Sequence, residues 1–316
     1  MEPNVIHHID FLNNTLPDKC ANLIIADPPY YKTKGEFDFI WPTFQHYLKD
    51  VEKWAAECKR LLKDNGTLFW YGSAKKIAYA QVIFDQHFDL LNNLVWNKGN
   101  FMNLEEWDGM RSFAPCTERI LMYSNETLNL TKSIYHIRDY IRQEITEAKG
   151  KIVLKRVNEA LGTATNGGGV ASACLSLEKT EPAMITKEMY NKLQTWCSPH
   201  LTKDYDELRA EYEALRRPFQ NLFKLQEILN FSNEQNQTGD KYDHETVKPE
   251  TLTRALMLTT SNKNDTVVIP FAGSGTECAM SARENRPFYA FEIAEKHLKT
   301  SNDRVKRIID TPTMSF

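Results

Sequence analysis

Several features that would place this protein in a membrane or an oxidising compartment are missing from its sequence. No stretch approaches the roughly 20 apolar residues that a membrane-spanning helix needs. Residues 1–10 are polar and lack the apolar centre of a secretory signal. The 6 cysteines are scattered without C-x-x-C pairs, which argues against a zinc site or a disulfide framework. We therefore expect a cytoplasmic protein with reduced thiols and no membrane contact.

The sequence also has no excess of positive charge. Its 39 Lys and Arg are outnumbered by 42 Asp and Glu, for a formal net charge of −3. Proteins that bind nucleic acids are often basic overall, so any phosphate contact here must come from local clusters. The clusters are Lys32 with Lys34, Lys75 with Lys76, Lys149 with Lys151, Lys155 and Arg156, and Arg216 with Arg217. Ordinary solvated surface is the competing interpretation for each of them.

The order of apolar segments predicts the fold class. A chain of 316 residues is long enough for one large domain, or for one domain with an insertion. Short apolar runs alternate with stretches of helical spacing, which predicts an α/β fold with a doubly wound, mainly parallel sheet. The expected strands are 5–9, 23–26, 67–71, 90–96, 120–123, 266–271 and 288–291, and the expected helices are 44–62, 74–87 and 277–284. Asn65-Gly66 is expected to close the first of these helices.

The alternation stops between residues 126 and 240. Within this segment, 186–196 and 204–217 have the apolar spacing of helices. Two small or polar stretches, 162–174 and 232–242, are typical of loops. We therefore expect a mostly helical insertion that divides the α/β domain into residues 1–125 and 241–316. Packing or dimerisation would explain such an insertion as well as substrate binding would.

The most informative motif is Asp27-Pro28-Pro29-Tyr30. It directly follows the apolar run 23–26, so it is expected at the C-terminal end of a buried strand, where open α/β sheets bind their ligands. The prolines fix the backbone and donate no hydrogen bond, so their carbonyls can point at a ligand. A carboxylate and a carbonyl can both accept from a planar amino group, and a tyrosine can stack on the ring that carries it. The motif suits a flat amino-heterocycle such as adenine.

A second motif lies far downstream. The strand expected at 266–271 is followed by the tight turn Ala272-Gly273-Ser274-Gly275-Thr276, whose glycines allow close approach to a ligand. The strand expected at 288–291 ends at Glu292, and an acid at this spacing is placed to hold ribose hydroxyls. The glycine spacing is not the three-glycine dinucleotide fingerprint. A nucleoside-like cofactor without a pyrophosphate fits better.

Together these motifs resemble those of the DNA amino-methyltransferases, which use S-adenosylmethionine (AdoMet). Asp27-Pro28-Pro29-Tyr30 is similar to the catalytic motif of that family, and Phe271 to Thr276 resembles its cofactor loop. His244-Glu245-Thr246-Val247-Lys248-Pro249 resembles the H-x-T-x-K-P segment that precedes the loop. The catalytic motif comes first and the cofactor motifs come last, with a long variable region between them. This order is similar to the beta class, and it implies a circularly permuted Rossmann-like fold.

The resemblance implies a role for each motif residue. Asp27, Pro28, Pro29 and Tyr30 would bind the target base, with Tyr30 stacked on it. The implied AdoMet site consists of Asp10, Asp27, His244, Thr246, Lys248, Phe271, Gly273, Ser274, Gly275, Thr276 and Glu292. Within it, Glu292 would hold the ribose, Lys248 the methionine carboxylate, and Asp10 the cofactor adenine. The implied chemistry needs no metal.

The resemblance also implies partners. The substrate would be a short specific sequence in double-stranded DNA, with the target adenine flipped out of the helix. Residues 126–240 would form the target-recognition region, the active protein would be a homodimer, and a separate cognate endonuclease could accompany it.

Four alternatives stay open: cytosine-N4 methylation, methylation of RNA or protein, a relative that only binds DNA, and cytosine-C5 chemistry at Cys116. Asp27 favours adenine, since the cytosine-N4 enzymes more often carry serine there. Cys116 lacks the surroundings that C5 chemistry expects, and its neighbours Glu118 and Arg119 are expected to support the end of the sheet.

Overall fold

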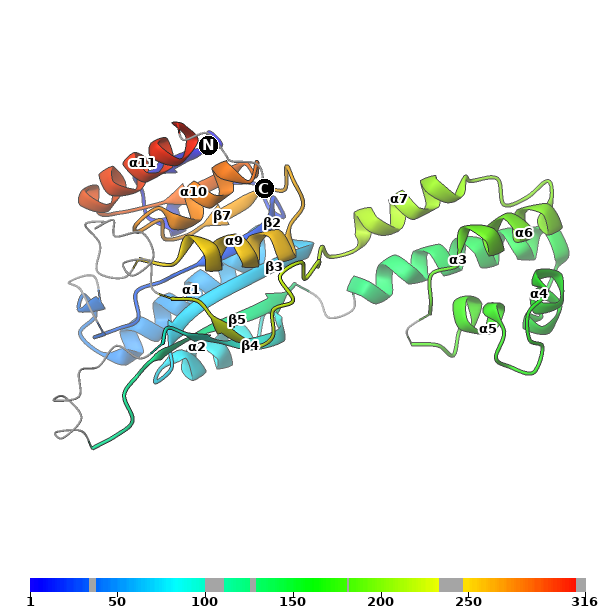
Figure 1. Cartoon of the computed structure of the whole chain (residues 1–316), viewed down its shortest axis with the longest axis horizontal. Helices are drawn as coiled ribbons and strands as arrows, with labels where there is room; N and C mark the ends of the chain where they lie inside the picture. The colour runs from blue at the N-terminus through cyan, green and yellow to red at the C-terminus, as the bar shows by residue number, and fades with distance from the viewer. Residues whose placement is uncertain (34–37, 100–110, 126–128, 181, 233–246, 311–316) are drawn as a thin grey trace. The chain divides into compact units, whose positions relative to one another are not determined.

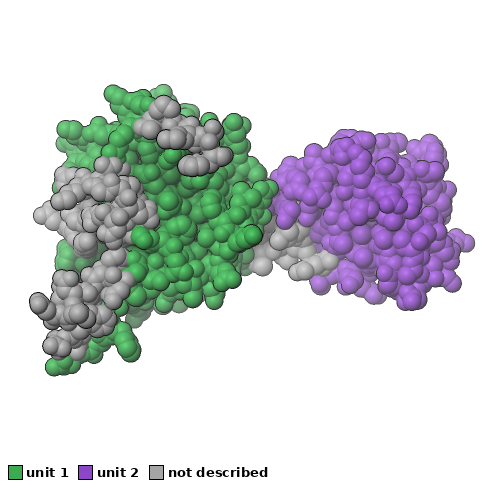
Figure 2. All heavy atoms as spheres, in the orientation of Figure 1, with its two compact units in different colours: residues 1–126, 218–316 green, residues 127–217 purple. Residues whose placement is uncertain are grey.

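The chain forms two compact units, residues 1–126 with 218–316 and residues 127–217 (Figures 1 and 2). The structure is a computed structural model that describes residues 1–33, 38–99, 111–125, 129–180, 182–232 and 247–310. The second unit ends at Arg217, earlier than the insertion boundary of 240 that the sequence suggested. The reason is strand β6 (Ile228–Asn230), which pairs with the sheet of the first unit. Across the described ranges, every helix is too short or too polar to cross a bilayer.

The first unit is built on one eight-stranded sheet in the order β1-β8-β7-β2-β3-β5-β4-β6. The remaining strands are β1 (Val5–His7), β2 (Ala21–Ala26), β3 (Leu62–Ser73), β4 (Asp89–Asn97), β5 (Thr117–Ser124), β7 (Val267–Ile269) and β8 (Phe288–Phe291). Neighbouring strands are parallel except around β5, which runs opposite to both β3 and β4. The doubly wound, mainly parallel sheet expected from the sequence is therefore confirmed.

Helices cover both faces of this sheet (Figure 1). On one face, α1 (Phe44–Leu61) and α2 (Ile77–Phe84) pack on a core that includes Ile24 of β2. On the other face, α9 (Glu250–Thr260), α10 (Thr276–Arg283) and α11 (Glu295–Asp310) pack on a core that includes Leu23. Successive residues of a strand point to opposite faces, so β2 feeds both cores and is buried on both sides.

The sequence misplaced the junction between α1 and β3. Asn65-Gly66 was expected to close the helix, but α1 already ends at Leu61 and the two residues lie inside β3. The pairing with β2 shows why, because Ala21 faces Leu62 whereas Leu23 faces Thr67. Between these two pairs, β3 has more residues than β2 and forms a bulge at its start. Asn65-Gly66 lies in this bulge, and the strand continues beyond it.

The second unit is a helical body with its own core. It consists of α3 (Asn129–Lys149), α4 (Leu154–Leu161), α5 (Val170–Leu175), α6 (Lys187–Cys197) and α7 (Tyr205–Leu215). Isoleucines three or four residues apart line one side of α3, and the other helices pack their apolar residues against them. The loop expected at 162–174 is only partly a loop, because α5 begins inside it directly after Gly169. Most of the loop expected at 232–242 lies outside the described residues.

Candidate active site

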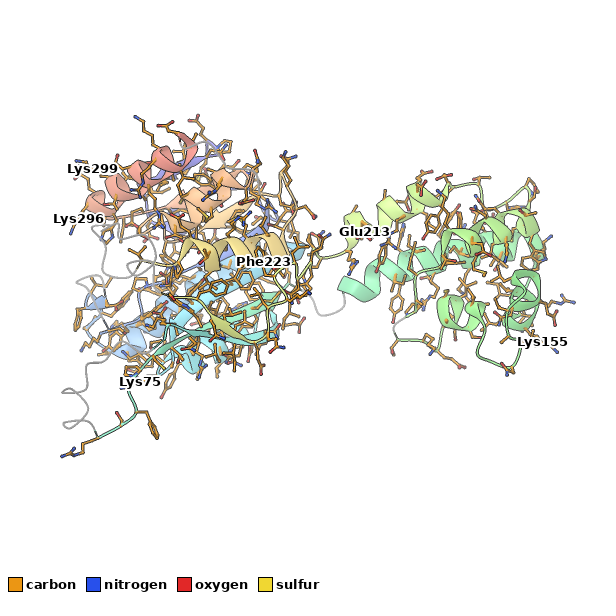
Figure 3. All side chains as sticks on the ribbon, viewed as in Figure 1. Lys75, Lys155, Glu213, Phe223, Lys296 and Lys299 are labelled. Atoms are coloured by element: carbon orange, nitrogen blue, oxygen red, sulfur yellow. The ribbon has the colours of Figure 1, made fainter. Side chains whose placement is uncertain are left out.

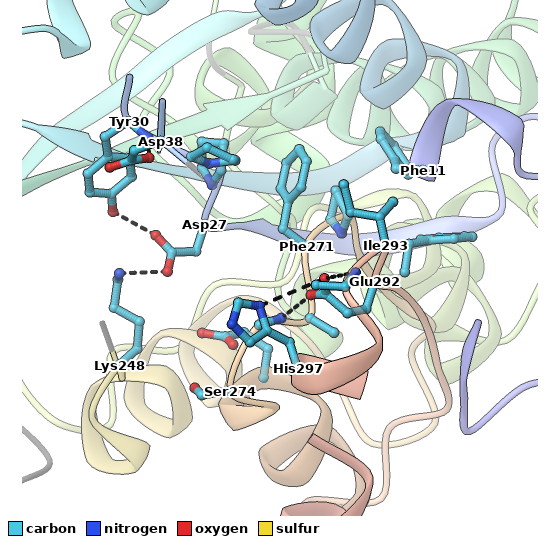
Figure 4. Close-up of a pocket in the computed structure, with 18 of the residues that line it drawn as sticks. Phe11, Asp27, Tyr30, Asp38, Lys248, Phe271, Ser274, Glu292, Ile293 and His297 are labelled. Carbon is cyan, nitrogen blue, oxygen red and sulfur yellow. Dashed lines mark hydrogen bonds and ion pairs between the residues drawn. The ribbon is translucent and has the colours of Figure 1, made fainter. Parts of the chain in front are cut away.

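The two sequence motifs meet at the point where the sheet changes winding direction. Strands β2 and β7 are parallel neighbours, with Leu23 opposite Val267 and Ile24 opposite Val268. The chain continues from β2 to β3 on one side and from β7 to β8 on the other, so the C-terminal ends of β2 and β7 border a crevice. A cavity of about 420 Å³ lies there, lined by residues of both motifs (Figure 4). Its volume is in the range of sites for small molecules and cofactors.

Asp27 holds two hydrogen-bond partners at this cavity (Figure 4). The Tyr30 hydroxyl donates to Asp27 Oδ1 at 2.6 Å, and Lys248 Nζ donates to Asp27 Oδ2 at 2.6 Å. The Lys248 side chain is only 3% exposed, and its Nζ lies 5.4 Å from the centre of the Tyr30 ring and 5.3 Å from that of Tyr71. Asp27 is therefore part of a buried, pre-positioned ion pair.

Glu118 joins this pair from β5, which is antiparallel to both of its neighbours. Its Oε2 accepts from the Tyr30 hydroxyl at 3.1 Å and lies 3.5 Å from Lys248 Nζ, and its Oε1 accepts from Lys98 Nζ at 3.0 Å. Because β5 is antiparallel to β3, the start of β5 lies at the same sheet edge as the end of β3, with Glu118 opposite Ser73. The reversal of β5 thus brings a carboxylate to the ligand-binding edge.

The charges of this cluster influence one another. Burial is the largest influence on the pKa of Asp27 and raises it, with Lys248 opposing and Glu118 reinforcing the rise. Burial alone would lower the pKa of Lys248, but the carboxylates of Asp27 and Glu118 outweigh burial and raise it. For Glu118, Lys248 and Lys98 outweigh burial and lower the pKa. Lys248 is therefore held in its charged form between two acids.

Glu277, in the first turn of α10, is a third acid at the cavity. It is 4% exposed, and its Oε1 accepts from the Thr253 hydroxyl at 3.4 Å. Burial, followed by the nearby Asp27 charge, raises the pKa of Glu277 to about 7. A carboxyl group with such a pKa changes charge in the physiological range.

The turn after β2 is fixed by Asp38. The backbone N–H of Tyr30 donates to Asp38 Oδ1 at 2.6 Å, and the N–H of Lys32 donates to the Asp38 carbonyl at 2.6 Å. Tyr31 and Lys32 both have positive φ, a conformation that costs energy for residues other than glycine. These bonds to Asp38 keep Pro28 and Pro29 at the cavity wall.

The glycine turn is held by backbone contacts. Gly273 has a φ of +49°, and its N–H donates to Glu292 Oε2 at 2.9 Å. Glu292 Oε1 accepts from the N–H of Ala294 at 2.8 Å, and the N–H of Ala272 donates to the Phe291 carbonyl at 2.8 Å. The carboxylate of Glu292 thus joins the ends of β7 and β8, and it retains lone pairs for a ligand hydroxyl.

The second glycine of the turn serves packing. Gly275 has a φ of +77°, and a Cβ at this position would lie 2.7 Å from Cα of Ser301 in α11. Thr276 is buried behind the turn, where its hydroxyl donates to the Lys248 carbonyl at 3.1 Å and accepts from Arg304 at 2.6 Å. Arg304, whose side chain is 0% exposed, also pairs with Glu250 at 2.9 Å. These contacts fix the turn from below.

The cavity brings together most of the site residues that the sequence suggested. They are Asp10, Asp27, Pro28, Pro29, Tyr30, Lys248, Phe271, Gly273, Ser274 and Glu292. Gly275 and Thr276 are absent from the lining, because Gly275 packs against Ser301 of α11 and Thr276 contacts Lys248 and Arg304. Asp10 also caps the short 3-10 helix η1 (Phe11–Asn13), since its Oδ1 accepts from the N–H of Leu12 at 2.8 Å. His244 and Thr246 lie outside the described residues.

Two residue placements differ from the roles that the sequence suggested. Lys248 was expected at the methionine carboxylate, but the structure pairs it with Asp27. Glu118 was expected only to support the sheet end, but it lines the cavity. Glu277 and His297 also line the cavity and had not been singled out. The charged pair Glu118-Arg119, directly before the apolar run of β5, is the signal that could have marked Glu118.

The lining suits an AdoMet-sized ligand better than a metal ion. The cavity combines apolar walls, residues of the Gly273 turn and an acid at the end of β8. Within the described ranges, the group of three possible metal ligands with closely spaced atoms is Glu144, Glu147 and His200, which belongs to the second unit.

Comparisons with known proteins identify the family. A family model described as DNA methylase matches residues 21–303. The type II methyltransferase M.HinfI of Haemophilus influenzae is 23% identical over 314 residues, a match covering 94% of this chain and 66% of M.HinfI.

Solved structures agree on the fold. The complex of M1.HpyAVI with SAM superposes with a TM-score of 0.51 at 18% identity, covering 95% of this chain and 98% of that one. The cytosine-N4-specific PvuII DNA methyltransferase superposes with a TM-score of 0.53 at 14% identity, covering 98% and 93%. The family match spans both motifs and all residues that line the cavity except Ile9, Asp10 and Phe11. We conclude that this chain belongs to the family of DNA amino-methyltransferases that act on adenine N6 or cytosine N4 with AdoMet as cofactor.

Proposed function

We propose that this protein methylates N6 of adenine within a short specific sequence of double-stranded DNA. The observation that carries the proposal is the position of Asp27, paired with Lys248 and Tyr30, in one cavity with the Gly273 turn. An aspartate at this position favours adenine over cytosine, because the cytosine-N4 enzymes that the motif resembles more often carry serine. The target base would be flipped out of the duplex to reach the cavity.

The proposed cofactor site lies at the glycine end of the cavity. Glu292 would accept hydrogen bonds from the ribose hydroxyls, because its carboxylate is held in place by two backbone amides and still has free lone pairs. Phe271 and Ser274 would line the same site, and Asp10 would contact the cofactor adenine. AdoMet, when bound, supplies an electrophilic methyl group.

The proposed catalytic step depends on the other end of the cavity. The amino nitrogen of adenine is a poor nucleophile, since its lone pair is delocalised into the ring. Asp27 and the Pro28 carbonyl would accept the hydrogen bonds of the amino group and so favour a more tetrahedral nitrogen. Tyr30 and Lys248 occupy only part of the acceptor capacity of Asp27, so the carboxylate has room for this donor. Oriented before the reaction, these groups stabilise the charge that develops during transfer.

Glu118 would act as a positioning residue. It contacts Tyr30, Lys248 and Lys98 and would act on the base through Asp27 and Tyr30. The positive charge of Lys248 is shared between Glu118 and Asp27 and does not neutralise Asp27 completely. Asp27 would therefore remain a strong hydrogen-bond acceptor.

The second unit would take part in reading the DNA sequence, as expected for the segment between the two motifs. A homodimer and a separate cognate endonuclease remain part of the proposal through the family resemblance.

Cytosine-N4 methylation is the second candidate, because the fold is shared with the cytosine-N4-specific PvuII enzyme.

One experiment distinguishes these functions. Purified protein is incubated with unmethylated plasmid and AdoMet carrying a labelled methyl group, and the DNA is digested to nucleosides for mass spectrometry. We expect label in N6-methyladenosine of the deoxy series. Label in N4-methylcytosine would instead show cytosine-N4 methylation, the second candidate. DNA binding without any methyl transfer would indicate a relative that only binds DNA.

A further inference from the structure

The basic cluster at residues 149–156 has no place in the cavity described above. Lys149, Lys151, Lys155 and Arg156 lie between Glu147 and Glu159 with no acid among them. The second unit carries 14 Lys and Arg against 12 Asp and Glu, whereas the whole chain has a net charge of −3. Positive charge is therefore concentrated in this unit, and this segment is its densest part.

The four cations stand apart from the ion pairs of the same unit. Lys187, Lys192 and Lys203 each pair with a carboxylate, at 2.6 Å, 2.8 Å and 2.5 Å respectively. Among the described residues of this unit, no ion pair involves any cation of the 149–156 segment. Lys155, labelled in Figure 3, is exposed on α4. Like charges without neutralising partners repel one another, so a surface of this kind suits an anion supplied from outside.

Three of these cations line a hollow. Its volume is about 360 Å³, and it lies among the end of α3, the start of α4 and Trp196 of α6. Lys149, Lys151 and Arg156 line it, together with the acid Glu159. Its floor includes Ile145 and Val157, each 1% exposed.

An aromatic ring completes the hollow. Lys149 Nζ lies 5.5 Å from the centre of the half-buried Trp196 ring. The ring therefore presents a flat apolar surface beside a cation. A polyanion with apolar sugars between its charges matches this combination better than a small isolated anion does, because the cations are exposed and spread around the rim.

We propose that the hollow lined by Lys149, Lys151 and Arg156 beside Trp196 binds the phosphodiester backbone of double-stranded DNA. This proposal rests on the proposed function, since it assigns a surface to the same substrate. Long flexible cations contact phosphates without reading sequence, so this surface would position the unit on the duplex and leave base reading to other residues. Deoxyribose would pack against the Trp196 ring.

The test uses the salt dependence of binding by the full-length protein. Affinity for a duplex of random sequence is measured by fluorescence anisotropy at several salt concentrations, for the wild type and for Lys151→Ala/Arg156→Ala. Each phosphate that a protein neutralises contributes about −0.9 to the slope of log K against log salt. We expect the slope of the double variant to be shallower by roughly 1.8, with weaker binding at low salt.

Lys187→Ala/Lys192→Ala is the matched control. It removes the same charge from the same unit, but from lysines that are paired with acids. We expect its slope to equal that of the wild type. Equal changes in both double variants would mean that only net charge matters, and the hollow would then have no specific role.

A second readout needs no substitution. Lysine acetylation of the wild type, mapped by mass spectrometry, should be reduced by DNA at Lys149 and Lys151 and unchanged at Lys187 and Lys192. Equal protection at all four would overturn the proposal. If the wild type methylates DNA while the hollow variant keeps the wild-type slope, this inference alone fails. If the wild type neither binds nor methylates DNA, the proposed function itself fails.

Discussion

The two ends of the cavity are built in different ways. At the end of β2, side chains dominate, since Asp27 is held by Lys248 and Tyr30 and supported by Glu118. At the end of β7, the backbone dominates, since Gly273 is tied to Glu292 through its N–H and Gly275 allows close packing. The first end concentrates buried charge, which suits stabilisation of a reacting group. The second end offers backbone groups and the carboxylate of Glu292, which suits binding of a cofactor. Changes at the first end should therefore reduce turnover, and changes at the second should reduce cofactor affinity.

Asp27→Ala should have the largest effect, because it removes the acceptor for the amino group and leaves Lys248 buried without its closest partner. Turnover should fall by about 10²- to 10³-fold, in line with the loss of a pre-oriented stabilising group. AdoMet affinity, measured by calorimetry, should stay within a few-fold of the wild type. Asp64→Ala, at an exposed ion pair, is the control. Full activity of Asp27→Ala would remove the catalytic assignment.

Glu277→Gln tests whether the buried charge of Glu277 lowers the free energy of unfolding. The pKa of Glu277 is raised to about 7 in the folded protein, above its usual value of 4.5, so the folded state binds the proton more tightly than the unfolded state. The stability this provides is present at low pH and is lost as pH rises through 7. From pH 5 to 8 the wild type should lose about 3 kcal/mol more than Glu277→Gln in denaturant unfolding. Parallel stability curves for the two proteins would contradict the raised pKa.

Glu292→Ala probes the backbone end. It removes the acceptor of the Gly273 and Ala294 N–H groups together with the proposed ribose contact. We expect AdoMet to bind roughly 30-fold more weakly, equivalent to about 2 kcal/mol for hydrogen bonds to a charged group. Glu295→Ala, an exposed acid three residues further on, should bind AdoMet normally. Unchanged affinity in Glu292→Ala would exclude the ribose role.

Glu118→Gln should produce a smaller loss at the charged end. Glutamine can keep one hydrogen bond but no longer balances Lys98 and Lys248. The kcat should fall about tenfold, the equivalent of one charged hydrogen bond, with little change in the KM for AdoMet. The acid limb of the pH–rate profile should also shift, because the pKa values of Asp27 and Lys248 depend on the Glu118 charge. A merely structural role would instead lower stability and leave the profile in place.

Tyr30→Phe should have the smallest effect. It deletes the hydroxyl that donates to Asp27 and Glu118 but keeps the ring. We expect activity to fall about fivefold, close to 1 kcal/mol for one hydrogen bond, while Tyr30→Ala should lose far more. If Phe were as damaging as Ala in the same methylation assay, the hydroxyl rather than the ring would be the essential group.

The sequence was sufficient to locate both ends of the cavity. Asp27 and Gly273 each follow an apolar run, and parallel strands place their C-terminal ends at one edge, so their proximity followed from strand order. Glu118 could not be placed in this way, because its position depends on the reversed direction of β5. Gly273 and Gly275 look equivalent in the sequence, but the structure bonds Gly273 to Glu292 and packs Gly275 against Ser301.

The boundary of the second unit and the support of the glycine turn also required the structure. Strand β6 buries only Leu229 and no long apolar run marks it, yet it returns the chain to the sheet before residue 240. Arg304 lies in a helix of otherwise polar appearance, but its side chain is buried under the turn, where it reaches Thr276 and Glu250. Such contacts join residues far apart in the chain, and local patterns do not encode them.

A crystal structure with the AdoMet analogue sinefungin tests the central claim most directly. The claim is that the acidic proline turn and the glycine turn serve a single ligand cavity. We predict electron density for the analogue between them, with its ribose at Glu292 and its reactive end directed toward Asp27. Density on another face of the unit, or a ribose bound away from Glu292, would contradict the account.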